Sequence, residues 1–336
     1  MEQFLQALAS GLAIGSIYAL IALSLVLLYR TTNILNFAHG EFGLLGSFLA
    51  FYLLTLFKLP YGLSFILSLL AALLLGGFIS LLLLNPGKVA LSTGLGILLT
   101  ALAYGLSLGL WLAAVIGSLA GILAYIFFHE GKQKPSELGL IILTLGVNLA
   151  LQGFYSLAFG NDNKILPPLI ADTTVRVGGA ALSRLSLLTS LVGVLMMGLL
   201  WLLLNKTKIG LAMRAVAQRE DVARAMGIPV KAVMFATWGV SAVLAAAAAL
   251  LLAPSTLLAP TMMFEPLSKG FVAGVIGGMN SLPGAIVGGY VLGVLELLVG
   301  VYVSNEFKAS FAFLVVIIVL VLRPHGLLGK AQVRRV

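Results

Sequence analysis

The chain has 336 residues, of which 61% are hydrophobic and only 9% are charged. A soluble domain carries about 25% charged residues, so this composition excludes a water-soluble globular protein. The absence of cysteine excludes disulfides, thiol catalysis and iron–sulfur ligation. The formal net charge of +9 does not indicate nucleic-acid binding, because the basic residues gather at the ends of apolar segments, as in the cytoplasmic loops of membrane proteins.

Long runs without Asp, Glu, Lys or Arg define the predicted fold. They cover residues 3–29, 59–87, 89–128, 138–161, 232–264, 270–295 and 309–322. A membrane-spanning helix needs about 20 apolar residues, so several runs hold one helix and the longest, 89–128, has room for two. We therefore predict an all-α, polytopic transmembrane helix bundle of about nine spans, with a range of about 8–10, that forms a single domain over residues 1–336.

In chain order, polar connections separate the predicted apolar segments. The segments are 4–29, a second one that is interrupted by polar residues at 33–46 and runs through Phe57, then 62–84, 90–110, 111–128, 138–159, 185–204, 232–253, a glycine-interrupted segment at 268–303, and 309–322. The two longest connections are 160–184 and 205–231.

The distribution of Lys and Arg predicts the sidedness of the bundle. The loop 205–231 and the tail 323–335 are rich in both, so we expect both on the cytoplasmic side. The chain must then cross the membrane an even number of times between them. If 232–253 and 309–322 each cross once, 268–303 must enter and leave on the same side as a bent hairpin. Counting backwards places the other long connection and the N-terminus outside.

The loop 205–231 is long for a cytoplasmic connection and predicts a short helix. Gly227 can end this helix, and a proline follows at position 229. Ala223 and Gly227 fall on one helix face, with Val222 and Met226 beside them. A small-residue face flanked by apolar side chains suits insertion into a groove on another protein. The alternative is an amphipathic helix that rests on the membrane surface.

The block 33–46 places polar side chains where apolar ones are expected. A midplane carboxylate costs about 2.5–3.5 kcal/mol, so Glu41 must be paired, hydrated or close to an interface. His39–Gly40 permits a helix break, which only a protein-lined cavity tolerates within the membrane. We therefore expect a broken or re-entrant segment that contributes Asn36, His39 and Glu41 to a permeation path. In the alternative interpretation the block lies at the level of the cytoplasmic headgroups.

The segment 268–289 is also broken, by Gly277-Gly278 and by Pro283-Gly284. Broken apolar segments in the two halves of a transporter are the best indication of its binding site from sequence. The alternative is that these glycines serve close helix packing alone.

Three motifs and the C-terminal tail carry a resemblance to a known family. The motifs are Asn36-Phe37-Ala38-His39-Gly40-Glu41, preceded by Gly15-Ser16-Ile17-Tyr18-Ala19-Leu20; the Gly-rich stretch 277–289 with Ser281, Pro283 and Gly284; and Gly210-Leu211-Ala212-Met213-Arg214-Ala215-Val216-Ala217, followed by Met226-Gly227-Ile228. The tail begins Arg323-Pro324-His325-Gly326. Over about residues 1–57 and 111–336 the chain resembles the branched-chain amino acid permease family of ABC importers, which includes urea and short-chain amide permeases.

The resemblance implies roles for particular residues, because in that family the loop docks into an ATPase subunit and transmits nucleotide-driven closure. It implies coupling to the ATPase through Ala217, Arg219, Glu220, Asp221, Ala223, Met226 and Gly227. It implies a translocation path near Asn36, His39, Gly40, Glu41, Gly277, Gly278, Ser281, Pro283 and Gly284.

The resemblance also implies the function and partners. We expect a multi-pass permease of the bacterial plasma (inner) membrane that carries leucine, isoleucine or valine for a binding-protein-dependent importer. Its expected partners are membrane lipid, a second permease subunit, homologous or identical, two cytoplasmic ATPase subunits and an external solute-binding protein. Urea or a short-chain amide is the alternative solute. No nucleic acid and no cofactor are expected.

Two other classes of function are weighed against this one. An ion-coupled secondary transporter needs buried carboxylates within the spans, for which Glu41 and Glu296 are the candidates. An intramembrane enzyme needs a nucleophile paired with a base, and no such pair is apparent, so we expect no enzymatic activity. The sequence has no G-x-x-x-x-G-K-[ST] loop, so ATP must be hydrolysed by another chain. Its three histidines lie far apart, and no metal site is expected.

Overall fold

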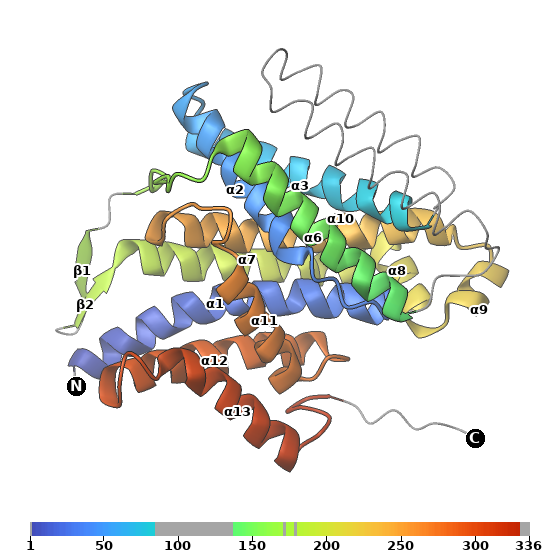
Figure 1. Cartoon of the computed structure of the whole chain (residues 1–336). Coiled ribbons are helices and arrows are strands. Elements are labelled where there is room, and N and C mark those ends of the chain that lie inside the picture. Colours follow the sequence, from blue (N-terminus) through green and yellow to red (C-terminus); the bar gives the residue numbers. More distant parts are fainter. Residues whose placement is uncertain (1, 85–136, 171–172, 178–179, 330–336) are drawn as a thin grey trace.

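The computed structural model describes residues 2–84, 137–170, 173–177 and 180–329, and these form a bundle of helices (Figure 1). In chain order the elements are α1 (Glu2–Thr32), α2 (His39–Thr55), α3 (Tyr61–Leu84), α6 (Glu137–Phe159), β1 (Thr174–Val177), β2 (Ala180–Ser183), α7 (Arg184–Lys206), α8 (Lys208–Gln218), α9 (Glu220–Ala225), α10 (Val230–Leu252), the 3-10 helix η1 (Ala253–Ser255), α11 (Phe264–Gly277), α12 (Leu282–Tyr302) and α13 (Lys308–Leu322). The strands β1 and β2 pair as an antiparallel hairpin.

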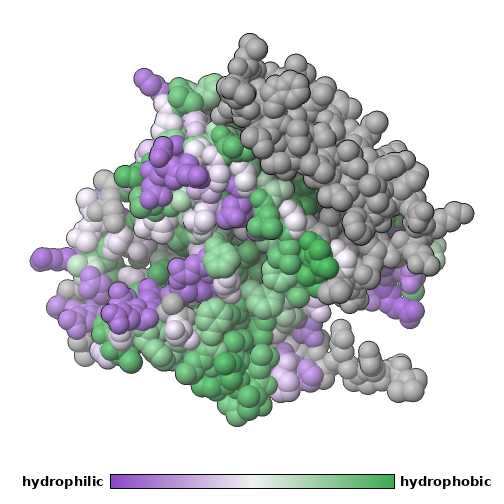
Figure 2. All heavy atoms as spheres, in the orientation of Figure 1, coloured by the Kyte–Doolittle hydropathy of each residue, from purple (hydrophilic) through white to green (hydrophobic). Residues whose placement is uncertain are grey.

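The predicted all-α, polytopic class is confirmed. Within the described ranges, five helices are long and apolar enough to cross a membrane, namely α1, α3, α7, α10 and α12, and α13 contains a shorter apolar helix. The count of about nine spans stays a prediction, because the expected segments 90–110 and 111–128 lie outside the described residues. On the face in Figure 2, a broad hydrophobic area includes α13, and many hydrophilic residues gather at the end where α1 begins.

Helix α1 lies at the centre of the bundle and contacts α7, α8, α10, α11 and α12. Helix α1 packs so closely on α12 that their backbones are in contact. A Cβ atom built on Gly289 would lie 2.4 Å from Cα of Ala19, and one on Gly293 would lie 2.4 Å from Cα of Gly15. Small residues on both helices therefore permit this packing, as is common between membrane helices.

Helices α11 and α12 form the bent hairpin that the sequence predicts. Helix α11 has 14 residues, and is therefore about 21 Å long, less than the roughly 30 Å of a bilayer's hydrocarbon core. It ends before Gly278, whose φ of 107° a glycine adopts without strain. The returning helix packs closely on it, since a Cβ on Gly288 would lie only 2.0 Å from the carbonyl oxygen of Ala273.

The C-terminal segment after α13 returns to the turn of this hairpin. The amides of Leu327 and Leu328 donate to the carbonyls of Ile276 and Gly277, at 2.8 and 3.0 Å. These carbonyls belong to the last turn of α11 and would otherwise lack helical partners. The segment that resembles the ending of the family therefore caps the helix at the hairpin turn.

The polar connections lie at opposite ends of the bundle (Figure 1). The start of α1 and the β1–β2 hairpin are at one end, and α8 and α9 are at the other. The ends of α1 and α7 and the start of α12 meet α8 around a common pocket, at the second of these ends. This arrangement separates the loop 205–231 from the connection 160–184, as the predicted sidedness requires. Which membrane face each end meets stays a prediction.

The contact between α1 and α12 predicts the effect of adding one methyl group. In Gly289→Ala the new Cβ would overlap the backbone of Ala19, so we expect a loss of about 1–3 kcal/mol of stability. The measurement is the midpoint of thermal unfolding of the detergent-solubilised chain. The matched control is Gly198→Ala on α7, where a Cβ would meet no atom of the described residues within 4 Å. Equal midpoints for Gly289→Ala and the wild type would contradict the close packing.

Candidate functional site

The helix break in the first block lies upstream of the predicted position. Helix α1 ends at Thr32, Asn33 takes a φ of 55°, and α2 begins at His39 and runs unbroken through Gly40. The predicted broken segment at 33–46 is therefore confirmed, but the helix is interrupted at 33–38 and not at His39–Gly40, where the sequence also permits a break. The physical reason is local: Asn33 adopts the left-handed conformation that asparagine tolerates, and the Asn36 side chain accepts from the Ala38 amide at 3.0 Å.

His39 is fully buried and joins three helices through hydroxyl groups. Its Nε2 lies 2.6 Å from Oγ of Ser24, and this serine donates to the carbonyl of Ile21 at 2.6 Å. Because the serine proton is used there, Nε2 of His39 is assigned as the donor. The Ser24 carbonyl in turn accepts from Oγ of Ser241 at 2.7 Å. A polar chain thus links α2, α1 and α10 in the core.

Glu41 is also buried, with 5% of its surface exposed, and its partners come from α6. Its Oε1 accepts from the Asn148 side-chain amide at 3.2 Å, and its backbone carbonyl accepts from the Tyr155 hydroxyl at 2.8 Å. One helical turn before Asn148, Thr144 accepts from the Phe37 amide at 3.3 Å. Helix α6 therefore presents a polar stripe to the start of α2.

Three polar atoms of this block have no hydrogen-bond partner among the described residues. They are Asn36 Nδ2, His39 Nδ1 and Glu41 Oε2. Unsatisfied polar groups in a buried site are costly, and they mark places where a solute, water or another chain would be stabilised. The role of Asn36, His39 and Glu41 in a path stays a prediction. Gly40 serves close packing, because a Cβ there would lie 3.3 Å from Met263 and Leu267.

The second predicted block does not join the first. Ser281 accepts from the Gly284 amide at 3.1 Å and so caps α12, with Pro283 in the first turn of the helix. A Cβ on Gly277 would lie 1.9 Å from the Gly284 carbonyl oxygen, and Gly278 turns the chain. These residues occupy the hairpin turn at the end of α11, while Gly40 meets the beginning of that helix. Their local contacts favour the packing interpretation, apart from Pro283, which lines a pocket.

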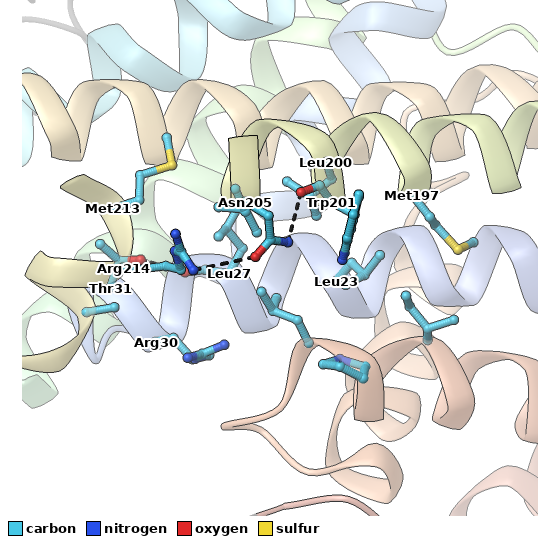
Figure 3. A pocket seen from close by; sticks show the side chains of 15 residues that line it. Leu23, Leu27, Arg30, Thr31, Met197, Leu200, Trp201, Asn205, Met213 and Arg214 are labelled. Atoms are coloured by element: carbon cyan, nitrogen blue, oxygen red, sulfur yellow. Dashed lines mark hydrogen bonds between the residues drawn. The ribbon is translucent and has the colours of Figure 1, made fainter. Parts of the chain in front are cut away.

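That pocket has a volume of about 320 Å³ and lies between α1, α7, α8 and α12 (Figure 3). Its wall is apolar except for Arg30, Thr31, Asn205 and Arg214. The lining residues are Leu23, Leu27, Arg30, Thr31, Met197, Leu200, Trp201, Leu204, Asn205, Met213, Arg214, Ala217, Leu282, Pro283 and Ile286. Sequence reasoning missed this site because four segments that are distant in the chain build it.

The predicted coupling segment forms a sharply ended helix at the tip of the loop. Helix α8 stops at Gln218, Arg219 adopts an extended conformation, and α9 follows. The Ile228 amide donates to the Ala223 carbonyl at 3.0 Å and the Gly227 amide to that of Arg224 at 3.1 Å. With a φ of 82° at Gly227, this is a Schellman motif, and it confirms Gly227 as the helix stop.

The faces of α9 differ from the expectation in one respect. Ala223 is only 4% exposed, so it packs toward the bundle and does not contribute to an outward small-residue face. Met226 and Val222 are 79% and 48% exposed and form the outward apolar surface instead. The reason is that both helix ends are tied to α8 and α10 by short connections, which fixes the rotation of α9. Asp221 is exposed and Glu220 pairs with Arg224 at 2.6 Å, while Ala217 of α8 lines the pocket.

A buried ion pair escaped the sequence analysis. Lys269 of α11 lies 2.7 Å from the Glu296 carboxylate of α12, and their side chains are 7% and 1% exposed. Two less buried charged residues extend this cluster. Glu265 lies 2.5 Å from Lys269, and Lys308 lies 3.7 Å from Glu296. Counting from the turn of the hairpin does not reveal the pair, because Lys269 lies eight residues before the end of α11 and Glu296 lies fourteen residues after the start of α12. Glu296 thus has a structural partner.

This ion pair predicts an asymmetric result for single and double substitutions. Lys269→Met leaves the Glu296 carboxylate buried with only the more distant Lys308, so we expect a loss of about 3 kcal/mol. Lys269→Met combined with Glu296→Leu removes both charges and should recover most of that loss. Thermal unfolding in detergent measures both, with the exposed Glu306→Gln as the control. If the double variant were less stable than Lys269→Met, the ion-pair account would fail.

Comparison with known proteins identifies the family. The family model described as "Branched-chain amino acid transport system / permease component" matches residues 7–107 and 88–322, including the region 62–110, where the motifs offer little guidance. The chain is 30% identical to the "High-affinity branched-chain amino acid transport system permease protein LivH" of Escherichia coli K12, over 99% of this chain and 98% of that protein.

Two further relatives agree with this. The chain is 29% identical to the corresponding permease protein BraD of Pseudomonas aeruginosa, over 99% of this chain and 98% of the relative. It is 28% identical to a probable branched-chain amino acid transport permease protein of Methanocaldococcus jannaschii, over 96% and 91%. The predicted resemblance and membrane location are confirmed, and the family is a transport family, not an enzyme family. The chain belongs to the branched-chain amino acid transport system permease family, a family of multi-pass membrane proteins.

Proposed function

We propose that this chain is the membrane-spanning subunit of an inner-membrane ABC importer and carries leucine, isoleucine or valine. The family assignment and the printed names of its relatives support the solute class. We further propose that two copies of this chain, or this chain and a homologous one, form the path. Two cytoplasmic ATPase subunits drive it and an external binding protein delivers the solute.

The observation that carries the proposal is the apolar tip of α9. Met226 and Val222 are exposed at the end of the bundle where the polar loop lies, and large exposed apolar side chains outside the bilayer mark a protein contact. The flanking Arg219, Asp221 and Arg224 form a charged rim, as interfaces of this kind have. We assign this surface, Val222 and Met226 with their charged neighbours, as the ATPase contact.

The connections of α9 support its role as a mechanical link. Helix α8, which precedes it, contacts α1, α7 and α10, and α10 follows it directly. Ala223, on the inner face of α9, is buried against the bundle. The helix therefore cannot shift without moving its neighbours. A displacement imposed on α9 by a nucleotide-driven ATPase would therefore reach the central helix α1. This is the route by which we propose that ATP binding changes the access to the path.

The ATPase contact predicts the effect of charge at its centre. Met226→Glu places a carboxylate in the proposed interface without disturbing the chain's own packing, since this side chain is 79% exposed. We expect the ATPase subunit to dissociate during purification and solute-stimulated ATP hydrolysis to fall by about tenfold or more. Gly227→Trp at the same tip is less informative, because the φ of 82° at Gly227 strains any other residue. Ala223→Arg is less informative because it would disrupt the fold.

The matched control is Ile165→Glu, which introduces the same charge at a residue that is 69% exposed on the connection 160–184. This variant should retain the ATPase subunit. The proposal is contradicted if Met226→Glu and the control retain the ATPase equally and drive uptake at the wild-type rate.

We also propose that the start of α2 lines the path. Its polar atoms without partners, Glu41 Oε2 among them, support this, because an amino acid brings an ammonium group that a carboxylate binds. Glu41→Gln keeps the acceptor for Asn148 but removes the charge. We expect uptake to fall about tenfold while the ATPase subunit stays bound.

For this variant, radiolabelled leucine uptake into proteoliposomes that contain the whole importer is the measurement, and the exposed Glu306→Gln is the control. Undiminished uptake by Glu41→Gln would exclude a role of this carboxylate in the path.

A further inference from the structure

The pocket between α1, α7, α8 and α12 has an unusual distribution of charge. Its lining contains two guanidinium groups, from Arg30 and Arg214, and no carboxylate. Among the described residues neither arginine forms an ion pair; Arg214 donates only to the Asn205 side chain, at 3.4 Å. Two arginines beside an apolar wall suit a ligand that combines an anion with a hydrocarbon portion.

The two arginines lie at the same end of the pocket (Figure 3). Arg30 and Arg214 are on one side of the view, with Thr31 beside them, whereas Leu23 and Met197 lie toward the opposite side. The Asn205 side chain connects these regions, since it donates to the Trp201 carbonyl at 2.9 Å and accepts from Arg214. The pocket therefore has a polar end and an apolar end.

An exposed apolar stripe continues from this pocket along α7. Trp201 lines the pocket and is nevertheless 57% exposed, so the pocket opens to the side of the bundle. Further along the helix, Val194 and Leu187 stay exposed, seven and fourteen residues before Trp201, at two-turn spacings that keep all three on one side. In a membrane-spanning helix such a face meets lipid acyl chains, and residues at these spacings share one side.

We propose that this pocket binds an anionic phospholipid, with the phosphodiester between Arg30 and Arg214 and an acyl chain along Trp201 and the stripe of α7. Basic pockets between transmembrane helices near the cytoplasmic face are the type of site that holds anionic headgroups. The predicted cytoplasmic position of α8, rich in neighbouring Lys and Arg, agrees with this. The site is distinct from the polar block at the start of α2.

The site also contacts the segment that precedes α9. Met213, Arg214 and Ala217 of α8 line the pocket, and α9 begins three residues after Ala217. A lipid held there contacts α1, α7 and α8 at once. Its headgroup would therefore stabilise one position of α8 relative to the bundle.

The test is lipid binding to the purified full chain in neutral detergent, followed by native mass spectrometry. Phosphatidylglycerol is titrated against phosphatidylcholine of the same acyl chains. We expect the wild type to bind phosphatidylglycerol about tenfold or more tightly than phosphatidylcholine, and Arg30→Gln with Arg214→Gln to abolish the difference. Arg184→Gln, at the opposite end of α7, is the matched control and should bind like the wild type.

A second readout locates the lipid without relying on the arginine variants. Phosphatidylglycerol with brominated acyl chains should quench the fluorescence of the wild type more than that of Trp201→Phe. Each variant is first compared with the wild type by thermal unfolding without added lipid, so that loss of binding is separated from loss of fold.

Three results would overturn the proposal. Equal binding of both lipids by the wild type would show that no anion site exists. Displacement of phosphatidylglycerol by an equal concentration of inorganic phosphate would show an anion site without an acyl portion. Displacement by leucine would assign the pocket to the transported solute. Strong phosphatidylglycerol binding that resists both competitors and requires both arginines would support the lipid site.

Discussion

The contact between the backbones of α1 and α12 is the constraint on which the rest of the bundle depends. Gly15 and Gly293 face each other without side chains, and Gly289 meets Ala19 in the same way. Because α12 is held there, the hairpin places α11 against α1 as well, where a Cβ on Gly270 would lie 2.3 Å from Ile21. The close approach of α12 to α1 therefore fixes the position of α11 and of the turn that the C-terminal segment caps.

Such close packing limits where charge can be placed, and each buried charge in the described bundle is met from another helix. Lys269 and Glu296 face each other across the hairpin, and Glu41 accepts from Asn148 on α6. Each of these two carboxylates has one oxygen without a hydrogen-bond partner among the described residues, so the two sites differ in their charge balance. Lys269 neutralises Glu296 across the hairpin, whereas no lysine or arginine of the described residues pairs with Glu41. That difference separates a structural charge from a candidate for solute contact.

Sequence patterns predicted those features that depend on local chemistry. The stop at Gly227, the turn at Gly278 and the polar block with Asn36 are set by residues within a few positions of each other. Sequence patterns did not predict features that depend on the rotation of a helix about its axis or on the register between two helices. The inward face of Ala223 depends on how α8 and α10 hold α9, and the pairing of Lys269 with Glu296 depends on the register of the hairpin. The pocket was not predicted because its lining comes from four helices, α1, α7, α8 and α12, whose relative positions the sequence does not give.

The corner between α7 and α8 shows why the pocket and the tip of α9 belong to one mechanical unit. A Cβ on Gly210 would lie 2.2 Å from the Leu203 carbonyl oxygen, and Thr207 both accepts from the Gly210 amide, at 3.0 Å, and donates to that carbonyl, at 2.6 Å. The corner is therefore stiff, and α8 cannot tilt independently of the end of α7. The pocket lies between this corner and α1. We therefore propose that its occupant limits how far a force on the proposed ATPase contact at Met226 displaces α8 toward the central helix.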